Sequence, residues 1–311
     1  MFSVIFPGQG SQYVGMGQDL HQKFSLVREI FEKVDNKLNY SLSNIILNGP
    51  ELDLRSTKNT QPAIMTIGVC IFEVLKKEFN LDLNKAEFFA GHSLGEYTAL
   101  VCSGALKIEN AAYLLSERGK AMQDSSPKDS GAMTAVIGMT ITEIDKEIKL
   151  LKGEGVCEIA NDNCYGQIVV SGTKSKIDNL NFNLKNKKKR SIVLPVSAPF
   201  HSSLMEPASK KMKDKIQNTN FLLPNPSIIS NVTAKEENNV DKIKLLLVEQ
   251  ITSRVRWRES VEYMIQNGIK EFIEIGPGKI LSGLIKKINK EVEIKSISTL
   301  DDIIKYYKKN D

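Results

Sequence analysis

Apolar residues recur every three or four positions near the N-terminus and predict an amphipathic helix over residues 17–38. The recurring positions are Leu20, Phe24, Val27, Phe31, Val34 and Leu38. A second helix is predicted over 63–75, opened by Thr60-Gln61-Pro62, which supplies a capping residue and an early proline. That helix is apolar nearly all round, so we expect it to be buried. A third predicted helix, 108–122, carries Arg118.

The middle of the chain has a pattern of its own. It follows the turn-rich stretch 125–131 and runs in the order β-α-β-β-α-β, which is the ferredoxin-like unit. We therefore predict a ferredoxin-like small domain, 127–196, inserted into a larger α/β-hydrolase-like domain formed by 1–126 and 197–311. The predicted strands are 132–139, 156–160, 167–171 and 192–196, and the predicted helices are 141–151 and 173–185.

The rest of the chain alternates helices and strands, which implies a mostly parallel sheet covered on both faces. Residues 1–7 are expected to form its first strand and 305–311 a solvated tail. The other predicted helices are 204–216 and 241–252, and the other predicted strands are 227–231 and 271–275.

Composition narrows the class of protein. The chain has 311 residues with 41% apolar and 25% charged residues, as expected for a globular protein. No apolar run approaches the roughly 20 residues of a membrane helix. The four cysteines form no C-x-x-C pair, which suits a reducing cytosol and argues against disulfides or zinc. The net charge of +5 is weak evidence for nucleic acid, and the basic run 185–190 is either a docking patch or a solvated helix end.

Gly91-His92-Ser93-Leu94-Gly95 is a G-x-S-x-G element between an apolar, strand-like run and a helix-like run. Two glycines allow a turn too tight for a Cβ, so the serine hydroxyl stands at the tip of a sheet. The following helix N-terminus leaves backbone N–H groups free to hold an oxyanion. The element predicts a serine nucleophile for acyl transfer; the alternative is an ordinary Gly-Ser turn.

A serine needs a base, and the chain has three histidines. His21 belongs to a surface helix, and the side chain of His92 should point away from that of Ser93. His201 follows a predicted strand in a loop, where catalytic groups are usually presented, so by elimination it is the base. The alternative is a capping or core histidine. No acidic residue stands out as its orienter, so a backbone carbonyl or an amide remains open for that role.

The loop after the first predicted strand places Gln9 between two glycines, so its backbone can approach a ligand closely. It lacks the lysine of a P-loop, and an oxyanion-hole donor is its better use.

Further motifs occur in a fixed order along the chain. They are Phe6-Pro7-Gly8-Gln9-Gly10-Ser11-Gln12, Gly91-His92-Ser93-Leu94-Gly95-Glu96, Arg118-Gly119, Phe200-His201-Ser202, Asn231-Val232-Thr233, Gln250 ahead of Val255-Arg256-Trp257, and Glu274-Ile275-Gly276-Pro277-Gly278. Together they resemble the malonyl-CoA:acyl carrier protein transacylases of dissociated fatty acid synthesis over essentially the whole chain. Polyketide-synthase acyltransferase domains share many of them.

The resemblance implies a role for each matching residue. Ser93 would be acylated, His201 would be its base, and the backbone carbonyl of Gln250 would orient the imidazole. Arg118 would bind the malonyl carboxylate. The oxyanion hole would use the backbone N–H groups of Gln9 and Leu94, and the other substrate-binding residues would be Phe200, Asn161 and Asn163.

The resemblance also implies partners, namely a coenzyme A thioester and an acidic acyl carrier protein. We expect no resident cofactor or metal, no nucleic acid or membrane partner, a monomer, and a bacterial cytoplasm or an organelle as its location. Three departures from the family pattern are Tyr165, Arg254 and Pro199-Phe200. The resemblance implies that the first two alter loops near the CoA or carrier site, and that a Phe before the histidine fits malonyl better than branched substrates.

Three alternatives stay open at this stage. A free-standing polyketide-type acyltransferase differs only in its carrier protein. A serine esterase or thioesterase is disfavoured by the missing carboxylate partner and by Arg118. A non-catalytic carrier-binding module is disfavoured by the presence of both Ser93 and His201.

Overall fold

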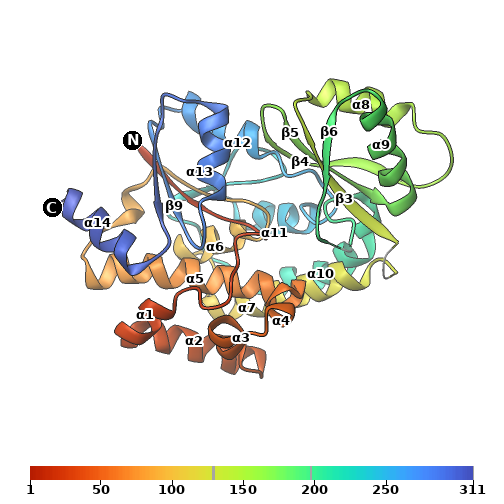
Figure 1. Cartoon of the computed structure of the whole chain (residues 1–311). Helices are drawn as coiled ribbons and strands as arrows, with labels where there is room; N and C mark the ends of the chain where they lie inside the picture. Colours follow the sequence, from red (N-terminus) through yellow and green to blue (C-terminus); the bar gives the residue numbers. More distant parts are fainter. Residues whose placement is uncertain (128–129, 197, 311) are drawn as a thin grey trace.

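The computed structural model describes residues 1–127, 130–196 and 198–310, which form two β-sheets flanked by helices (Figure 1). The larger sheet has the strand order β10-β9-β1-β2-β7-β8. Neighbouring strands are parallel except β7 and β8, so the predicted mostly parallel sheet is confirmed. Its strands are β1 (Phe2–Phe6), β2 (Phe88–Gly91), β7 (Ser227–Ile229), β8 (Glu236–Glu237), β9 (Glu271–Ile275) and β10 (Glu293–Ile297).

Helices bury both faces of this sheet, and because side chains alternate along each strand, successive residues enter different cores. Val4 and Phe6 of β1 pack into one core, whereas Ile5 packs into the other. Helices α12 (Trp257–Gln266) and α13 (Ile280–Ile288) cover the second face. On the first face, α5 (Thr57–Glu78) and α6 (Gly95–Cys102) contact the strands. The same core is completed by helices that pack around these two, namely α1 (Gln18–Lys23), α2 (Ser25–Leu38), α3 (Leu42–Asn48), α4 (Glu51–Arg55), α7 (Ile108–Asp124), α10 (Glu206–Gln217) and α11 (Val240–Glu249). No helix in the described ranges is long and apolar enough to cross a bilayer.

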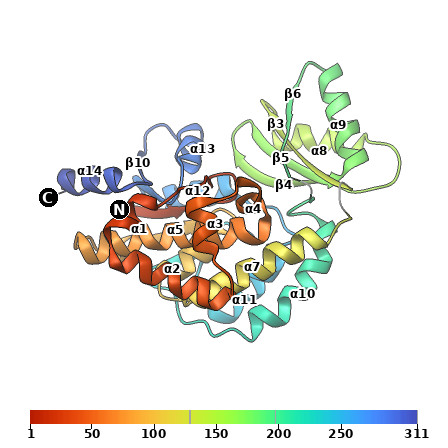
Figure 2. The same cartoon turned by 60° about the horizontal axis from the view of Figure 1, so that its bottom comes forward.

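The smaller sheet is antiparallel, with the order β4-β5-β3-β6, and helices α8 and α9 pack on one side of it (Figure 2). Its elements follow the predicted β-α-β-β-α-β order. They are β3 (Gly131–Ile137), α8 (Ile141–Lys149), β4 (Cys157–Cys164), β5 (Gln167–Thr173), α9 (Lys174–Asn186) and β6 (Arg190–Val193).

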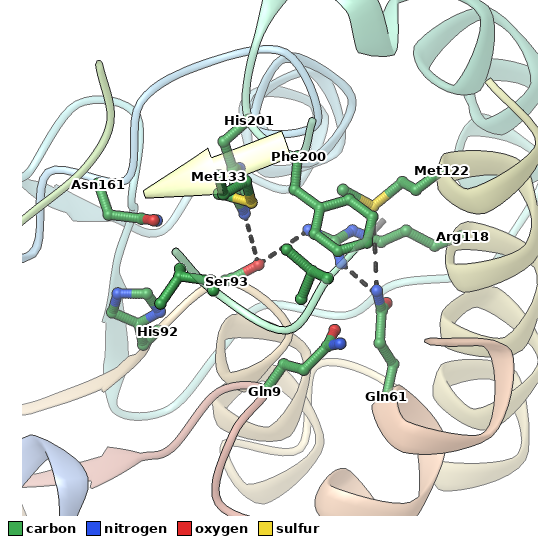
Figure 3. A pocket seen from close by; sticks show the side chains of 12 residues that line it. Gln9, Gln61, His92, Ser93, Arg118, Met122, Met133, Asn161, Phe200 and His201 are labelled. Atoms are coloured by element: carbon green, nitrogen blue, oxygen red, sulfur yellow. Dashed lines mark hydrogen bonds between the residues drawn. The ribbon is translucent and has the colours of Figure 1, made fainter. Parts of the chain in front are cut away.

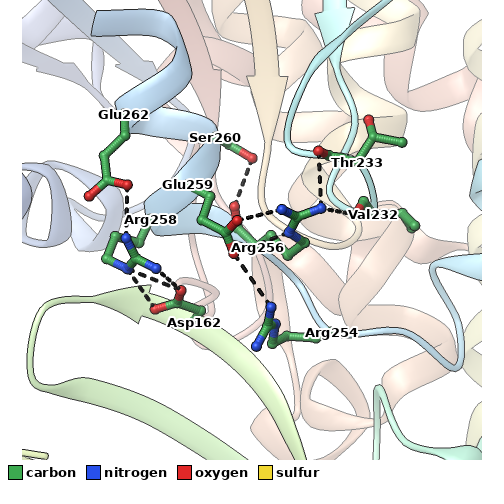
Figure 4. A network of polar contacts seen from close by, with 9 residues as sticks. All are labelled: Asp162, Val232, Thr233, Arg254, Arg256, Arg258, Glu259, Ser260 and Glu262. Atoms are coloured by element: carbon green, nitrogen blue, oxygen red, sulfur yellow. Dashed lines mark hydrogen bonds and ion pairs between the residues drawn. The ribbon is translucent and has the colours of Figure 1, made fainter. Parts of the chain in front are cut away.

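Strand β4 ties the two sheets together. Its backbone pairs with the loop before α12, since the Val255 N–H donates to Ala160 O at 2.8 Å and the Asp162 N–H donates to Val255 O at 2.9 Å. Arg258 of α12 then donates to both carboxylate oxygens of the buried Asp162 (Figure 4). These contacts fix the small sheet beside the end of the large one where the site lies.

Two helix predictions were wrong in detail. The helix expected over 17–38 is interrupted at Phe24, whose backbone is extended (φ −112°, ψ 126°). The ring of Phe24 still points into the core, so the apolar spacing survives the break. The second helix starts at Thr57 and runs through Pro62. Thr60 is no N-cap, because it lies within the helix and its hydroxyl donates to Leu54 O.

The chain ends also differ from the prediction. Part of the predicted solvated tail, 305–311, belongs to helix α14 (Leu300–Asn310), in which Ile303 is fully buried; Asp311 lies outside the described residues. Strand β10, which was not predicted, precedes that helix. Strand β6 ends at Val193 rather than at 196. The Leu194 N–H still donates to Met133 O at 2.9 Å, and Leu194 and Val196 line a cavity.

Candidate active site

Three neighbouring parallel strands, β1, β2 and β7, have their carboxyl ends at the same edge of the large sheet. Gln9 follows β1, Ser93 follows β2 and Asn231 follows β7. Loops at the carboxyl ends of parallel strands are where α/β sheets usually hold ligands. The strand order therefore brings together residues that are far apart in the sequence.

Ser93 stands on a strained turn between β2 and α6, with φ at 54°. The flanking glycines are required by close approach. A Cβ on Gly91 would lie 1.9 Å from Gly95 C, and one on Gly95 would lie 2.3 Å from Phe6 O. The turn holds the hydroxyl at the sheet edge, in the arrangement of a nucleophile elbow.

His201 contacts both predicted neighbours. Its Nε2 lies 2.8 Å from Ser93 Oγ and its Nδ1 lies 2.9 Å from the backbone O of Gln250. A carbonyl only accepts, so Nδ1 carries the proton and Nε2 is left to accept from the serine. Burial, with a further contribution from Arg118, lowers the pKa of His201 to about 3, so the free imidazole is neutral at pH 7.

The Arg118 side chain extends from α7 to Ser93 and is only 1% exposed. Its Nη1 donates to Gln61 Oε1 at 2.8 Å, and its Nη2 donates to Gln250 Oε1 at 2.8 Å and to Ser93 Oγ at 3.1 Å. Its Nε–H has no partner among the described residues. Burial lowers the pKa of Arg118. A buried guanidinium with an open donor is suited to an anionic ligand.

A cavity of about 120 Å³ opens in front of Ser93. Figure 3 shows the Ser93 hydroxyl between His201 and Arg118, with Phe200 and Met122 nearby. The lining residues are Gln9, Gln61, His92, Ser93, Arg118, Met122, Met133, Asn161, Leu194, Val196, Phe200 and His201. The wall combines five apolar side chains with seven polar residues, a combination that suits a small ligand carrying polar groups.

The two predicted oxyanion donors also lie here. Gln9 lines the cavity, and Leu94 immediately follows the serine at the N-terminus of α6. Neither backbone N–H donates to an acceptor within 1–127, 130–196 and 198–310. Both N–H groups are therefore free to donate, although Leu94 itself is not one of the residues that line the cavity.

The remaining predicted site residues divide into two groups. Phe200 and Asn161 line the cavity, whereas Asn163 is absent from its lining. Asn163 Oδ1 instead lies 2.9 Å from His92 Nε2, so any influence of Asn163 on a ligand passes through His92. The His92 side chain points away from Ser93 as predicted, but it lines the cavity.

Sequence reasoning gave no role in the site to three buried polar residues, although two of them, Glu96 and Asn231, belong to the quoted motifs. Gln61 was interpreted as part of a helix start, yet its side chain holds Arg118. Asn231 and Glu96 stand behind the serine, and Asn231 Oδ1 accepts the Ser93 N–H at 2.6 Å. One available signal was the charged Glu96 in an otherwise apolar helix start.

No group of three or more His, Cys, Asp or Glu side chains suited to a metal occurs in the described part of the chain. The absence of a metal or cofactor remains a prediction.

Residues 3–310 match the acyl transferase domain family. The chain is 40% identical over 301 residues to the malonyl CoA-acyl carrier protein transacylase of Bacillus subtilis, covering 96% of this chain and 94% of that protein. The acyl-carrier-protein-S-malonyltransferase structure from Bartonella henselae superposes with a TM-score of 0.95 at 40% identity, covering 99% of this chain and 98% of that one. A type II PKS acyl-carrier protein in complex with its malonyl-transacylase gives a TM-score of 0.95 at 34% identity, covering 99% of each chain.

Proposed function

The chain belongs to the acyl transferase domain family, and we propose that it moves a malonyl group from malonyl-CoA to the phosphopantetheine thiol of an acyl carrier protein in fatty acid synthesis. One observation carries the proposal: Ser93, His201 and the carbonyl of Gln250 form a continuous contact chain beside the buried Arg118.

In the first half-reaction, Ser93 Oγ attacks the thioester carbonyl while His201 Nε2 takes its proton. The carbonyl oxygen becomes an oxyanion, held by the N–H groups of Gln9 and Leu94. Each such donor is typically worth about 3–4 kcal/mol in the transition state. Collapse breaks the C–S bond, the imidazolium protonates the CoA thiolate, and a malonyl ester remains on Ser93.

In the second half-reaction, His201 takes the proton of the carrier thiol, whose sulfur attacks the ester. The C–O bond breaks and Ser93 recovers its proton. This is ping-pong covalent catalysis. Phe200, Met122 and Met133 form an apolar part of the cavity wall, which offers a hydrolytic water few hydrogen-bond partners.

Arg118 selects the acyl group. A malonyl ester on Ser93 carries a free carboxylate two carbons beyond the ester carbonyl, so the short chain can return to the guanidinium that already contacts Ser93 Oγ. A planar guanidinium pairs bidentately with a carboxylate. An acetyl group leaves the buried charge without this partner.

The carrier protein docks on the surface formed by α9 and β6. Lys185, Lys189 and Arg190 line a shallow groove there, together with Phe182, which is 63% exposed. Lys187 is already paired with Glu147 at 2.6 Å. The groove supports docking of an acidic partner with an apolar face. Beyond β6 the chain continues to Leu194 and Val196 in the active cavity.

A triple variant, Lys185→Ala with Lys189→Ala and Arg190→Ala, should raise the KM for carrier protein about tenfold or more. The KM for malonyl-CoA should stay unchanged. Lys210, Lys211 and Lys213 on α10 provide a control with the same loss of charge. Equal KM values for carrier in the two triple variants would remove the groove from the docking account.

The finer fold assignment belongs to the same proposal. We assign 1–126 and 197–311 to an α/β-hydrolase-like domain and 127–196 to a ferredoxin-like one, supported by the strand order β4-β5-β3-β6. Residues 128–129, 197 and 311 of these ranges lie outside the described residues. A monomer, the lack of a resident cofactor and a cytoplasmic location remain predictions.

The proposed function is tested by thiol release from malonyl-CoA. We expect a single burst without carrier protein and continuous turnover with it, because the malonyl enzyme waits for an acceptor thiol. Continuous release without carrier would instead identify a thioesterase. Turnover with a polyketide carrier but not with a fatty acid carrier would indicate the polyketide pathway, as in the complex described above.

A further inference from the structure

Glu96 is a buried carboxylate behind the nucleophile that none of the steps above uses. It lies in the first turn of α6, three residues after Ser93, and is 1% exposed. It does not line the substrate cavity. A carboxylate is rarely buried to this extent unless it is paired or strongly hydrogen-bonded.

Glu96 accepts hydrogen bonds from Asn231 and Gln250, and both of these residues also bond to the turn that carries Ser93. Its Oε2 accepts from the Asn231 backbone N–H at 3.0 Å and from Gln250 Nε2 at 2.8 Å. Asn231 in turn accepts the Ser93 N–H and donates to Gly91 O at 2.7 Å. Gln250 Nε2 also donates to Ser93 O at 3.1 Å. The strained turn is thus held from both sides by groups that Glu96 fixes.

The Glu96 carboxylate also sets which way the Gln250 amide points. Since a carboxylate only accepts, the amide nitrogen of Gln250 must face Glu96 and its oxygen must face Arg118. The backbone carbonyl of the same Gln250 accepts from His201. One residue therefore connects Glu96 to both the base and the selectivity arginine.

The negative charge of Glu96 can stabilise the positive charge that forms on His201 during catalysis. When His201 takes the serine proton, an imidazolium forms in a buried site beside Arg118. Within the described residues, Glu96 is the only carboxylate bonded to Gln250 or Asn231. Burial raises the pKa of Glu96 to about 7, while its two hydrogen bonds and Arg118 oppose that rise and Glu237 adds to it. Its charge can therefore change near neutral pH.

We propose that Glu96 is a positioning residue that supplies, through the Gln250 amide, the negative charge which a triad carboxylate supplies in serine hydrolases. The inference rests on the proposed acyl transfer. It assigns to this chain an indirect Ser-His-acid arrangement, in which the acid orients and neutralises without touching the histidine.

Glu96→Gln keeps the shape and removes the charge. The assay is single-turnover acylation of Ser93, with malonyl-CoA and acetyl-CoA as separate donors, from about pH 5 to about pH 9. In the wild type the rate should rise through about pH 7 as Glu96 ionises. His201, with a pKa of about 3, stays neutral over this pH range and does not contribute to the rise. The variant should lack that rise and be about 10- to 100-fold slower at high pH with either donor, at unchanged KM.

Two further variants separate charge from structure. Glu96→Asp keeps the charge and should restore the pH-dependent rise. Glu237→Gln makes the same chemical change at a neighbouring carboxylate outside the site, so the rise should persist and move to lower pH.

The outcomes are distinct. A folded Glu96→Gln enzyme with the wild-type rate and pH profile would overturn the inference and leave the proposed function intact. If that variant does not fold, a wild-type acylation rate that stays constant from about pH 5 to about pH 9 overturns it instead. A wild-type enzyme that malonyl-CoA never acylates would contradict the proposed function itself.

Discussion

Replacing Arg118 by alanine should erase the preference for malonyl over acetyl while leaving Ser93 reactive. In the folded protein, Gln61 and Gln250 fix the guanidinium beside the nucleophile. The substitution removes the donors that would face a malonyl carboxylate. An acetyl group makes no use of these donors.

The size of the effect follows from the hydrogen bonds lost. A hydrogen bond to a charged group contributes about 1.5–3 kcal/mol, so two in a fork contribute about 3–6 kcal/mol. At about 1.4 kcal/mol per tenfold, the malonyl-to-acetyl ratio of kcat/KM should fall by about 10²- to 10⁴-fold. Arg118→Lys keeps a charge without the planar fork and should fall in between.

The assay is a competition in which enzyme meets equal concentrations of malonyl-CoA and acetyl-CoA, and the two acyl enzymes are counted by intact mass. Thermal unfolding provides the control, since Gln61 and Gln250 lose a donor in the variant. An unchanged malonyl-to-acetyl ratio in a folded Arg118→Ala enzyme would refute the selectivity role.

Three other predictions concern the framework. Gly91→Ala should abolish acylation, because the added Cβ would lie 1.9 Å from Gly95 C. Gly283→Ala should stay active, because its added Cβ would meet no other part of the protein within 4 Å. An acylating Gly91→Ala enzyme would contradict the close approach. Asp162→Asn should lower the free energy of unfolding in urea by about 1–3 kcal/mol. Arg258 loses its buried partner Asp162 but keeps its ion pair with Glu262. An unchanged urea midpoint of unfolding would contradict this prediction. Glu96 has a folded pKa of about 7 against 4.5 unfolded, so the folded state binds the extra proton and wild-type stability falls as pH rises between these values. The stability of Glu96→Gln relative to wild type should therefore rise by up to about 3 kcal/mol from pH 5 to pH 8 in urea titrations, and a constant difference would contradict it.

Much of the fold could be predicted because local pattern and tertiary structure agree. Strand β9 matches its prediction at both ends, and the β-α-β-β-α-β order of the small sheet was found in full. Ser93 and its glycines were identified because the turn needs those residue types in that spacing.

The predictions that failed concern features set by contacts between residues far apart in the sequence or by breaks that leave the apolar spacing intact. Phe24 breaks a helix without breaking its apolar spacing, so periodicity alone could not reveal the interruption. The Gln61 side chain acts in the site because α5 and α7 pack side by side, a contact that no local pattern encodes. The orientation of the Gln250 amide likewise depends on Glu96, which is 154 residues away in the chain.

The most direct test of the account is peptide mapping of the enzyme after brief exposure to malonyl-CoA. We expect one malonyl group, carried on the peptide that contains Ser93, and its loss in Ser93→Ala and in His201→Ala. A malonyl group on another residue, or wild-type labelling in His201→Ala, would contradict the serine–histidine chemistry.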